Sequence, residues 1–157
     1  MAKPPSPRRP PAAGRAPERI AGYALEAQIG FVLRQAHQRA TAIFMSHFGR
    51  HQLTPTQWAT LVRIAEYGGL SQNHLGRLTA MDPATIQGVV ERLIERRLVS
   101  RIADSCDRRR KRLGLTPAGQ RLVRKLVASA GEVSRETLRP LAKAERALIL
   151  DLLVRLG

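Results

Sequence analysis

A run of cationic side chains lies in the second half of the chain and defines the chemistry to be explained. Residues 92–112 contain nine basic side chains, eight of them arginines, and three acidic ones. The planar guanidinium group presents a fork of N–H donors that matches phosphate oxygens and the edge of guanine. Each neutralised phosphate releases counterions, which adds affinity but no sequence preference. The run therefore predicts contact with a nucleic-acid backbone, against the alternative of a solvated charged surface.

The composition of the whole chain indicates the same kind of partner. Its 157 residues include 27 Lys and Arg, 23 of them Arg, against 12 Asp and Glu, and the formal net charge is +15. This length fits one ordinary domain, and 43% hydrophobic residues can form a core that is poor in aromatic side chains. No apolar run reaches the ~18 residues that cross a bilayer, and prolines follow Arg8 and Arg9 where an export signal needs an apolar segment. We therefore expect no membrane contact and a cytoplasmic, nucleoid-associated protein.

Catalytic and metal-binding functions find no support in the pattern. The sequence has no phosphate-binding glycine loop, zinc-protease motif or nucleophile elbow, so we expect neither an enzyme nor a cofactor. His47 and His51 are four residues apart, but Gly49 lies between them at an expected helix end and no third ligand is evident, which predicts no metal site. The single cysteine, Cys106, excludes an internal disulfide. Its arginine neighbours leave a redox role open, although an incidental exposed thiol is favoured.

Helical patterns and their end signals divide the chain into elements. Residues 1–19 hold six prolines and five basic residues and are expected to form a flexible arm. Apolar residues at three- and four-residue steps predict a long helix over residues 20–48 and five later helices. Residues typical of helix N-caps precede four of these: Thr54 before 55–67, Ser71 before 72–79, Asp82 before 83–97 and Thr116 before 117–138. The last helix carries Leu148, Ile149, Leu152, Leu153 and Leu156.

Two short extended segments complete the pattern. Residues 98–102 and 112–115 read as strands on either side of the polar stretch 103–111, which predicts a hairpin with an arginine-rich tip. The two short helices before the hairpin, joined by a tight turn, form a helix-turn-helix pattern. The first and last helices have more apolar surface than one small domain covers, which predicts a homodimer. The predicted fold class is mainly α with a small β-hairpin wing (α+β): a winged helix-turn-helix with N- and C-terminal dimerisation helices.

One set of residues at fixed spacing is more specific about function than the composition is. Around the hairpin the chain has the pattern D-x-R, then L-x-L-T-x-x-G, made by Asp107, Arg108, Arg109, Leu113, Leu115, Thr116 and Gly119. This pattern resembles the wing signature of the MarR family of bacterial transcription regulators, and residues 82–93 are similar to that family's recognition helix. The resemblance covers residues 20–157 and implies one domain, with a winged helix-turn-helix over 54–116 and dimerisation helices over 20–48 and 117–157. It also implies a homodimer that binds a palindromic operator in double-stranded DNA, most often as a repressor.

Two positions depart from the family pattern. Gly88 stands where many members carry a base-contacting arginine, so a different operator sequence is expected. Close approach of the helix backbone to DNA and close packing of helices both explain a glycine there. Arg97 replaces the glycine usual before the Leu-Val strand, which places a charged residue at a backbone position that others leave without a side chain.

The DNA-binding residues are predicted from these motifs. In the recognition helix, Gln87 can make a bidentate contact to adenine, and Ala84 or Thr85 can meet a thymine methyl group. The resemblance assigns Arg109 to the minor groove and Asp107 to orienting it, with the neighbouring cations on phosphates. The full predicted set is Ser71, Arg77, Pro83, Ala84, Thr85, Gln87, Gly88, Arg92, Asp107, Arg108, Arg109, Arg110 and Lys111.

The resemblance also implies a site for a small aromatic carboxylate, between the dimerisation helices and the winged helix. One face of the first helix offers a cation, an imidazole, a hydroxyl and a ring, and a second helix offers an indole. The predicted ligand set is Arg34, His37, Thr41, Phe44 and Trp58.

Each ligand prediction has a structural alternative. Trp58 can be an ordinary core residue. Arg34, if buried, needs an anionic partner, and Glu26 or Glu66 can supply one in place of a ligand. For the chain as a whole, the alternatives to a regulator are an architectural, sequence-tolerant DNA-binding protein and a small-molecule carrier.

Overall fold

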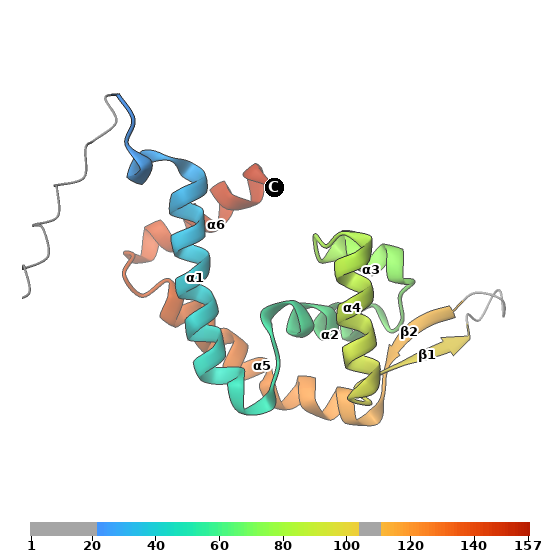
Figure 1. Cartoon of the computed structure of the whole chain (residues 1–157). Helices are drawn as coiled ribbons and strands as arrows, with labels where there is room; N and C mark the ends of the chain where they lie inside the picture. Colours follow the sequence, from blue (N-terminus) through green and yellow to red (C-terminus); the bar gives the residue numbers. More distant parts are fainter. Residues whose placement is uncertain (1–21, 104–110) are drawn as a thin grey trace, which may run out of the picture. The chain divides into compact units, whose positions relative to one another are not determined.

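The structure, a computed structural model, describes residues 22–103 and 111–157 (Figure 1). Contacts divide the chain after Gln35 into two units, each considered by itself. The elements confirm the predicted fold class, mainly α with a two-stranded hairpin. In chain order they are η1 (Leu25–Ala27), α1 (Ile29–Phe48), η2 (Gly49–His51), α2 (Pro55–Tyr67), α3 (Gln72–Leu78), α4 (Pro83–Glu95), β1 (Val99–Ala103), β2 (Lys111–Leu115), α5 (Pro117–Thr137) and α6 (Lys143–Leu156).

The first helix is shorter than its apolar pattern predicts. It begins at Ile29, where the sequence predicts helix from residue 20, and it has 20 residues. Gly22 has a φ of 77°, and Gln28 is extended at φ −83° and ψ 123°, so the helical path cannot continue through them. Phe31 and Val32 donate their N–H groups to the Gln28 carbonyl, which closes the first turn. Apolar periodicity alone therefore placed the start of this helix wrongly.

The predicted N-caps of the second unit are confirmed. The Thr54 hydroxyl accepts from the Gln57 N–H at 3.2 Å, and the Gln57 side chain accepts from the Thr54 N–H, a complete capping box. Asp82 accepts from the Thr85 N–H at 2.9 Å, and Thr116 caps α5 in the same way. Because a cap joins residues three apart in sequence, these helix starts are encoded locally.

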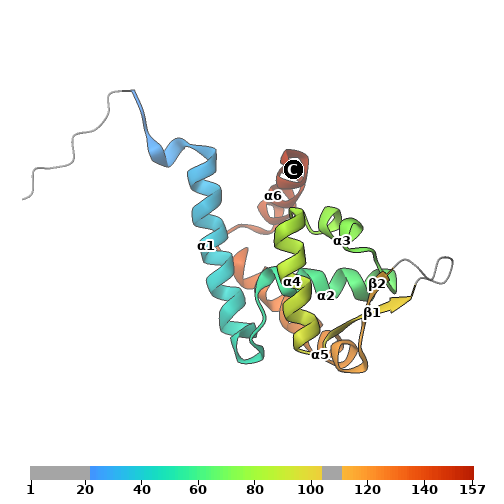
Figure 2. The same cartoon turned by 45° about the vertical axis from the view of Figure 1, so that its right-hand side comes forward.

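Helices α2, α3 and α4 lie together beside the hairpin, as two views of the chain show (Figures 1 and 2). Their inward side chains form one core with residues from α1, α5 and the strands. Aliphatic side chains dominate it, and Phe44 and Phe48 stack with ring centroids 4.1 Å apart. The side chains that are at most 1% exposed are Phe48, Leu53, Thr60, Leu61, Ile64, Leu75, Ile86, Val90, Leu93 and Leu126.

The hairpin has a third extended segment that the sequence did not indicate. Strands β1 and β2 pair antiparallel from Val99 with Leu115 to Ala103 with Lys111. Leu70, between α2 and α3, also pairs with Leu113: the Leu113 N–H donates to Leu70 O at 2.7 Å, and the Leu70 N–H donates back at 3.1 Å. The base of the wing is thus hydrogen-bonded to the start of the helix-turn-helix. Lys111 belongs to β2, and the prediction that it lies in the loop is wrong.

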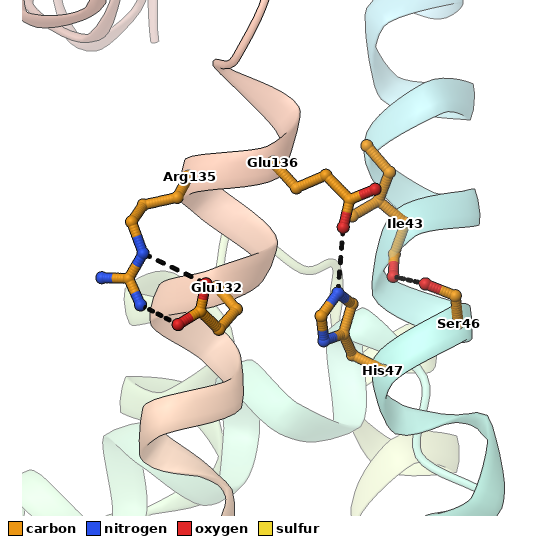
Figure 3. A network of polar contacts seen from close by, with 6 residues as sticks. All are labelled: Ile43, Ser46, His47, Glu132, Arg135 and Glu136. Atoms are coloured by element: carbon orange, nitrogen blue, oxygen red, sulfur yellow. Dashed lines mark hydrogen bonds and ion pairs between the residues drawn. The ribbon is translucent and has the colours of Figure 1, made fainter.

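A polar contact joins the second half of α1 to α5 (Figure 3). The His47 ring nitrogen Nε2 lies 3.0 Å from Glu136 Oε2, and the two side chains point toward one another. On the same helix Arg135 pairs with Glu132. Since both partners of the first pair are partly exposed, the contact orients α1 on α5 more than it stabilises the fold.

Helix α6 buries none of its side chains in the single chain. Its exposed apolar residues are Leu148, Leu150, Leu152, Leu153, Val154 and Leu156. Within the described residues no helix is long and apolar enough to cross a membrane. The apolar side chains of α6 therefore lie uncovered in the single chain.

Candidate nucleic-acid interface

Helix α4 presents two faces of opposite character. Ile86, Val89, Val90 and Leu93 are buried. The other face is open: Gly88 is half-buried, and the predicted DNA contacts Pro83, Ala84, Thr85, Gln87 and Arg92 are exposed. The spacing of the buried residues fixes which face of the helix is available to a partner.

Asp82 organises the first turn of this face. Its Oδ1 accepts from the Thr85 N–H at 2.9 Å and its Oδ2 accepts from the Thr85 hydroxyl at 2.5 Å. The hydrogen bond from the Thr85 side chain, with that from its backbone N–H, lowers the pKa of the Asp82 carboxyl below its usual range. The contribution of this cap to stability is therefore present above the unfolded-state pKa and is lost as the pH falls through the folded-state value.

In the next turn of α4, the side chain of Gln87 is held by a hydrogen bond to Glu91. Gln87 Nε2 donates to Glu91 Oε1 at 3.0 Å, one turn along the exposed face. This bond uses one amide N–H of Gln87, and the second N–H and the carbonyl oxygen are the pair of groups that can read adenine. Glu91 has no role in the sequence prediction, although its i, i+4 spacing from Gln87 could have indicated one.

Helix α3 crosses α4 closely because Gly76 lacks a side chain. A Cβ at Gly76 would lie 3.2 Å from Met81 O and 3.4 Å from Ile86 Cγ2. Ser71 caps α3 by accepting from the His74 N–H at 3.4 Å, and Arg77 is exposed in its last turn. Both predicted α3 contacts therefore lie at the surface of the helix-turn-helix.

The wing contributes its base to the described structure. Arg112 donates to Gly69 O at 2.7 Å, which fixes β2 against the segment before α3. Arg101 is exposed in the middle of β1, and Lys111 is exposed at the first residue of β2. Four predicted contacts, Asp107, Arg108, Arg109 and Arg110, lie outside the described residues.

The end of α4 is a tight motif that explains the departure at Arg97. Leu98 N–H donates to Leu93 O at 3.0 Å and Arg97 N–H donates to Ile94 O at 2.8 Å, the two bonds of a Schellman motif. This motif needs a left-handed residue, and Arg97 has a φ of 55°. Glycine adopts that conformation without the clash between Cβ and the carbonyl that other residues suffer. The helix ends at Glu95, two residues before its predicted end, because Arg97 reverses the chain.

Replacing Arg97 with glycine is expected to stabilise the fold by about 0.5–1 kcal/mol, because relief of left-handed strain exceeds the added freedom of the unfolded chain. Denaturant unfolding of the variant measures this gain. Arg97→Ala is the matched control, since it removes the same charge but keeps the strained backbone. If the alanine variant gains as much as the glycine variant, the charge of Arg97, and not its φ, is the destabilising feature.

Arg96 makes a contact that sequence reasoning missed. Its Nη1 donates to Gln52 O at 2.6 Å and its Nη2 donates to His51 O at 2.7 Å, across more than forty residues of sequence. Gln52 itself is left-handed at φ 51°, which turns both carbonyls toward the guanidinium. Arg96 thus fixes the end of α4 to the connector between α1 and α2, and nothing in the local pattern distinguishes it from its neighbours in the arginine run.

The predicted ligand residues fall into different environments. Phe44 is 7% exposed and stacks on Phe48, and Trp58 is half-buried with its ring centroid 5.1 Å from that of Phe48. Thr41 is half-buried and His37 is exposed on the same helix. Phe44 therefore belongs to the core and Trp58 packs against it, while His37 is exposed and Thr41 is half-buried.

Arg34 belongs to the first unit and is exposed. The condition under which Arg34 would need an anionic partner, burial, is therefore not met in the single chain. Glu66, one of its two suggested partners, accepts from Arg63 Nη1 at 2.8 Å. Among residues 22–103 and 111–157, no three His, Cys, Asp or Glu side chains are grouped as metal ligands.

Comparison with known proteins places these features in a family. Residues 51–110 match the model of the MarR family. The HTH-type transcriptional repressor NicR of Pseudomonas putida is 40% identical over 131 residues, 83% of either chain.

Two solved structures are similar over most of their length. One, from Pseudomonas aeruginosa, is 51% identical, with a TM-score of 0.81 over 85% of this chain and 100% of the other. The second is BpsR of Bordetella bronchiseptica, whose DNA binding is regulated by 6-hydroxynicotinic acid. It is 36% identical, with a TM-score of 0.80 over 85% of this chain and 96% of the other.

Proposed function

The chain belongs to the MarR family of DNA-binding transcriptional regulators, and from this premise we propose a homodimeric repressor that a small aromatic or heteroaromatic acid releases from a palindromic operator. The observation that carries the DNA-binding part is the exposed face of α4, capped and ordered by Asp82 and Glu91. This face opens next to a hairpin base held to the helix-turn-helix. A rigid reading helix beside a cationic wing is the arrangement that a major groove and its flanking phosphates accept.

The contacts to DNA divide into readers and clamps. We assign base contact to the first turns of α4, and phosphate contact to Arg77, Arg92 and Lys111, which are exposed cations. The wing signature assigns Arg109 to the minor groove and Asp107 to holding it. Clamps of this kind set affinity and its salt dependence, while the readers set the sequence.

The homodimer is proposed from apolar surface that the single chain leaves open. In the first unit Ile29 is 64% exposed, and on α6 Leu148 and Leu156 are 56% and 70% exposed. Large exposed apolar residues grouped on terminal helices are typical of an obligate subunit interface. A two-fold dimer presents two α4 helices to half-sites about one DNA turn apart, roughly 34 Å.

The effector class is proposed from the relatives together with the donors on α1. BpsR responds to 6-hydroxynicotinic acid, a ring with a carboxylate. Arg34 and His37 are three residues apart in α1 and both exposed, and a guanidinium with an imidazole suits a carboxylate. Thr41, Phe44 and Trp58 complete the proposed set with a hydroxyl and two rings. The effector must bind the DNA-incompetent dimer better, since equal affinity for both states changes nothing.

One experiment tests operator binding and release together. Duplexes selected from a random library by the full-length protein are expected to contain a palindrome. Members of a panel of aromatic and pyridine carboxylates are then expected to release the protein from these duplexes. Arg34→Ala is expected to bind the selected duplex like the parent yet to need about tenfold or more acid for release, because a charge-assisted contact contributes about 1.5–3 kcal/mol. Fluorescence anisotropy at fixed salt measures both properties.

Arg39→Ala is the control, since Arg39 is an exposed arginine of the same helix, five residues from Arg34. If the Arg34→Ala variant leaves the DNA at the same acid concentration as the parent, Arg34 has a structural role and the effector site lies elsewhere. A library that yields no preferred sequence would favour an architectural DNA-binding protein, which the net charge of +15 also suits.

A further inference from the structure

We propose that Gly88 leaves a gap in the exposed face of α4 that receives the 5-methyl group of a thymine, so that this base pair is one the protein selects. The inference rests on the proposed operator binding and deepens it, because it names a base and the residue that reads it. The sequence left two explanations for Gly88, close packing of helices or close approach to DNA.

Packing does not account for this glycine. A Cβ built on Gly88 meets no atom within 4 Å among the described residues. The comparison within the same domain is direct, since a Cβ at Gly76 would lie 3.2 Å from Met81 O and one at Gly119 would lie 2.1 Å from Leu98 O. The fold therefore leaves no room for a side chain at Gly119 and little room at Gly76. Gly88 costs helix stability relative to alanine, and among residues 22–103 and 111–157 no neighbouring atom requires the missing side chain. We therefore assign its advantage to contact with DNA, because it lies on the exposed face of α4.

The exposed residues one turn before Gly88 carry methyl groups. Positions three and four residues away on a helix are surface neighbours, so Ala84 and Thr85 flank Gly88 one turn earlier. The Thr85 hydroxyl donates its proton to Asp82 Oδ2, which leaves its methyl group and lone pairs for a partner. Two methyl groups around a missing side chain match the thymine methyl, whereas guanine and cytosine edges need hydrogen-bonding partners there.

The neighbouring groups support an A·T rather than a G·C pair beside the gap. Glu91 holds one amide N–H of the exposed Gln87, whose second N–H and carbonyl oxygen suit the N7 and N6 of adenine. No basic residue precedes Arg92 in α4, so the first two turns carry none of the usual guanine readers.

The experiment removes one methyl group at a time from the DNA. The full-length protein first selects its duplexes, and each thymine of the selected sequence is then replaced by deoxyuridine, which differs only in the 5-methyl group. At one position in each half-site, the replacement is expected to weaken binding about fourfold, the effect of burying one methyl group. In Gly88→Ala, whose added Cβ fills the gap, the ratio of affinities for thymine and uracil at that position is expected to fall to about one.

Stability separates this effect from misfolding. Gly88→Ala adds a better helix former at an open position, so its Tm is expected to rise by about 2–4 °C while its thymine preference disappears. Gly49→Ala is the matched control, because its Cβ also meets no described atom within 4 Å and it lies outside α4. This control is expected to keep the parent's ratio.

The possible failures can be told apart. The proposal for Gly88 is overturned if no replacement of thymine by deoxyuridine weakens binding, or if Gly88→Ala keeps the parent's ratio of affinities. Either result leaves the proposed operator binding intact. Selection of no preferred sequence at all overturns both.

Discussion

Replacing Gly119 with alanine is expected to lower the free energy of unfolding by about 3 kcal/mol or more. The new Cβ would lie 2.1 Å from Leu98 O and 3.1 Å from the Leu98 carbonyl carbon, and both are backbone atoms with no rotamer to change. The same Leu98 oxygen accepts the Thr116 N–H at 3.1 Å. Relief of the clash therefore separates the start of β1 from the start of α5 and breaks the hydrogen bond between Thr116 and Leu98, which holds the wing against α5.

Thermal or urea unfolding followed by circular dichroism measures this loss. Gly131→Ala in the same helix is the matched control. Its Cβ would meet only the flexible end of Arg135, at 3.7 Å, so the gain in helix propensity is expected to stabilise it by up to about 1 kcal/mol. Opposite signs for the two substitutions would establish the close approach at Gly119, and equal small effects would refute it.

Introducing a charge into the apolar surface of α6 is expected to abolish tight operator binding. Leu152 is 44% exposed in the single chain, so Leu152→Glu leaves the domain core unchanged but places a carboxylate in the proposed dimer interface. The variant is expected to sediment as a 17.4 kDa monomer at micromolar concentration, where we expect the parent to be a dimer. Because a linked second half-site raises affinity by about 10²–10⁴-fold, the monomer should bind the operator about 100-fold more weakly or worse.

The control for this prediction keeps the surface apolar. Leu152→Met has a similar volume and no charge, and it is expected to remain dimeric and to bind like the parent. A monomeric parent, or a Leu152→Glu dimer with full operator affinity, would remove α6 from the interface.

The sequence alone indicates the contacts behind these two predictions to different extents. Gly119 is part of the wing pattern, so the sequence predicted that the position matters. It did not predict why, since the reason is a carbonyl oxygen twenty-one residues earlier, at Leu98. The exposed leucines of α6 could be anticipated from composition alone, because a helix with that many apolar residues needs a covering surface.

By itself the sequence determined what depends on near neighbours along the chain. Thr54, Asp82 and Thr116 each cap a helix through a bond to the residue three positions later, so the starts of α2, α4 and α5 follow from adjacent residue types. The strand pair and the buried face of α4 follow from periods of two and of 3.6 residues.

Only the tertiary structure decided which distant groups meet. The Leu70–Leu113 bridge, the Arg96 contacts with the α1–α2 connector and the open space at Gly88 depend on how whole elements pack. In the sequence, Arg96 is one arginine among many, and Gly88 and Gly76 are both helical glycines. The physical reason is that the same residue type can lie at a close contact between elements, at a bend or beside open space. The atoms that distinguish these cases belong to elements far away in the sequence.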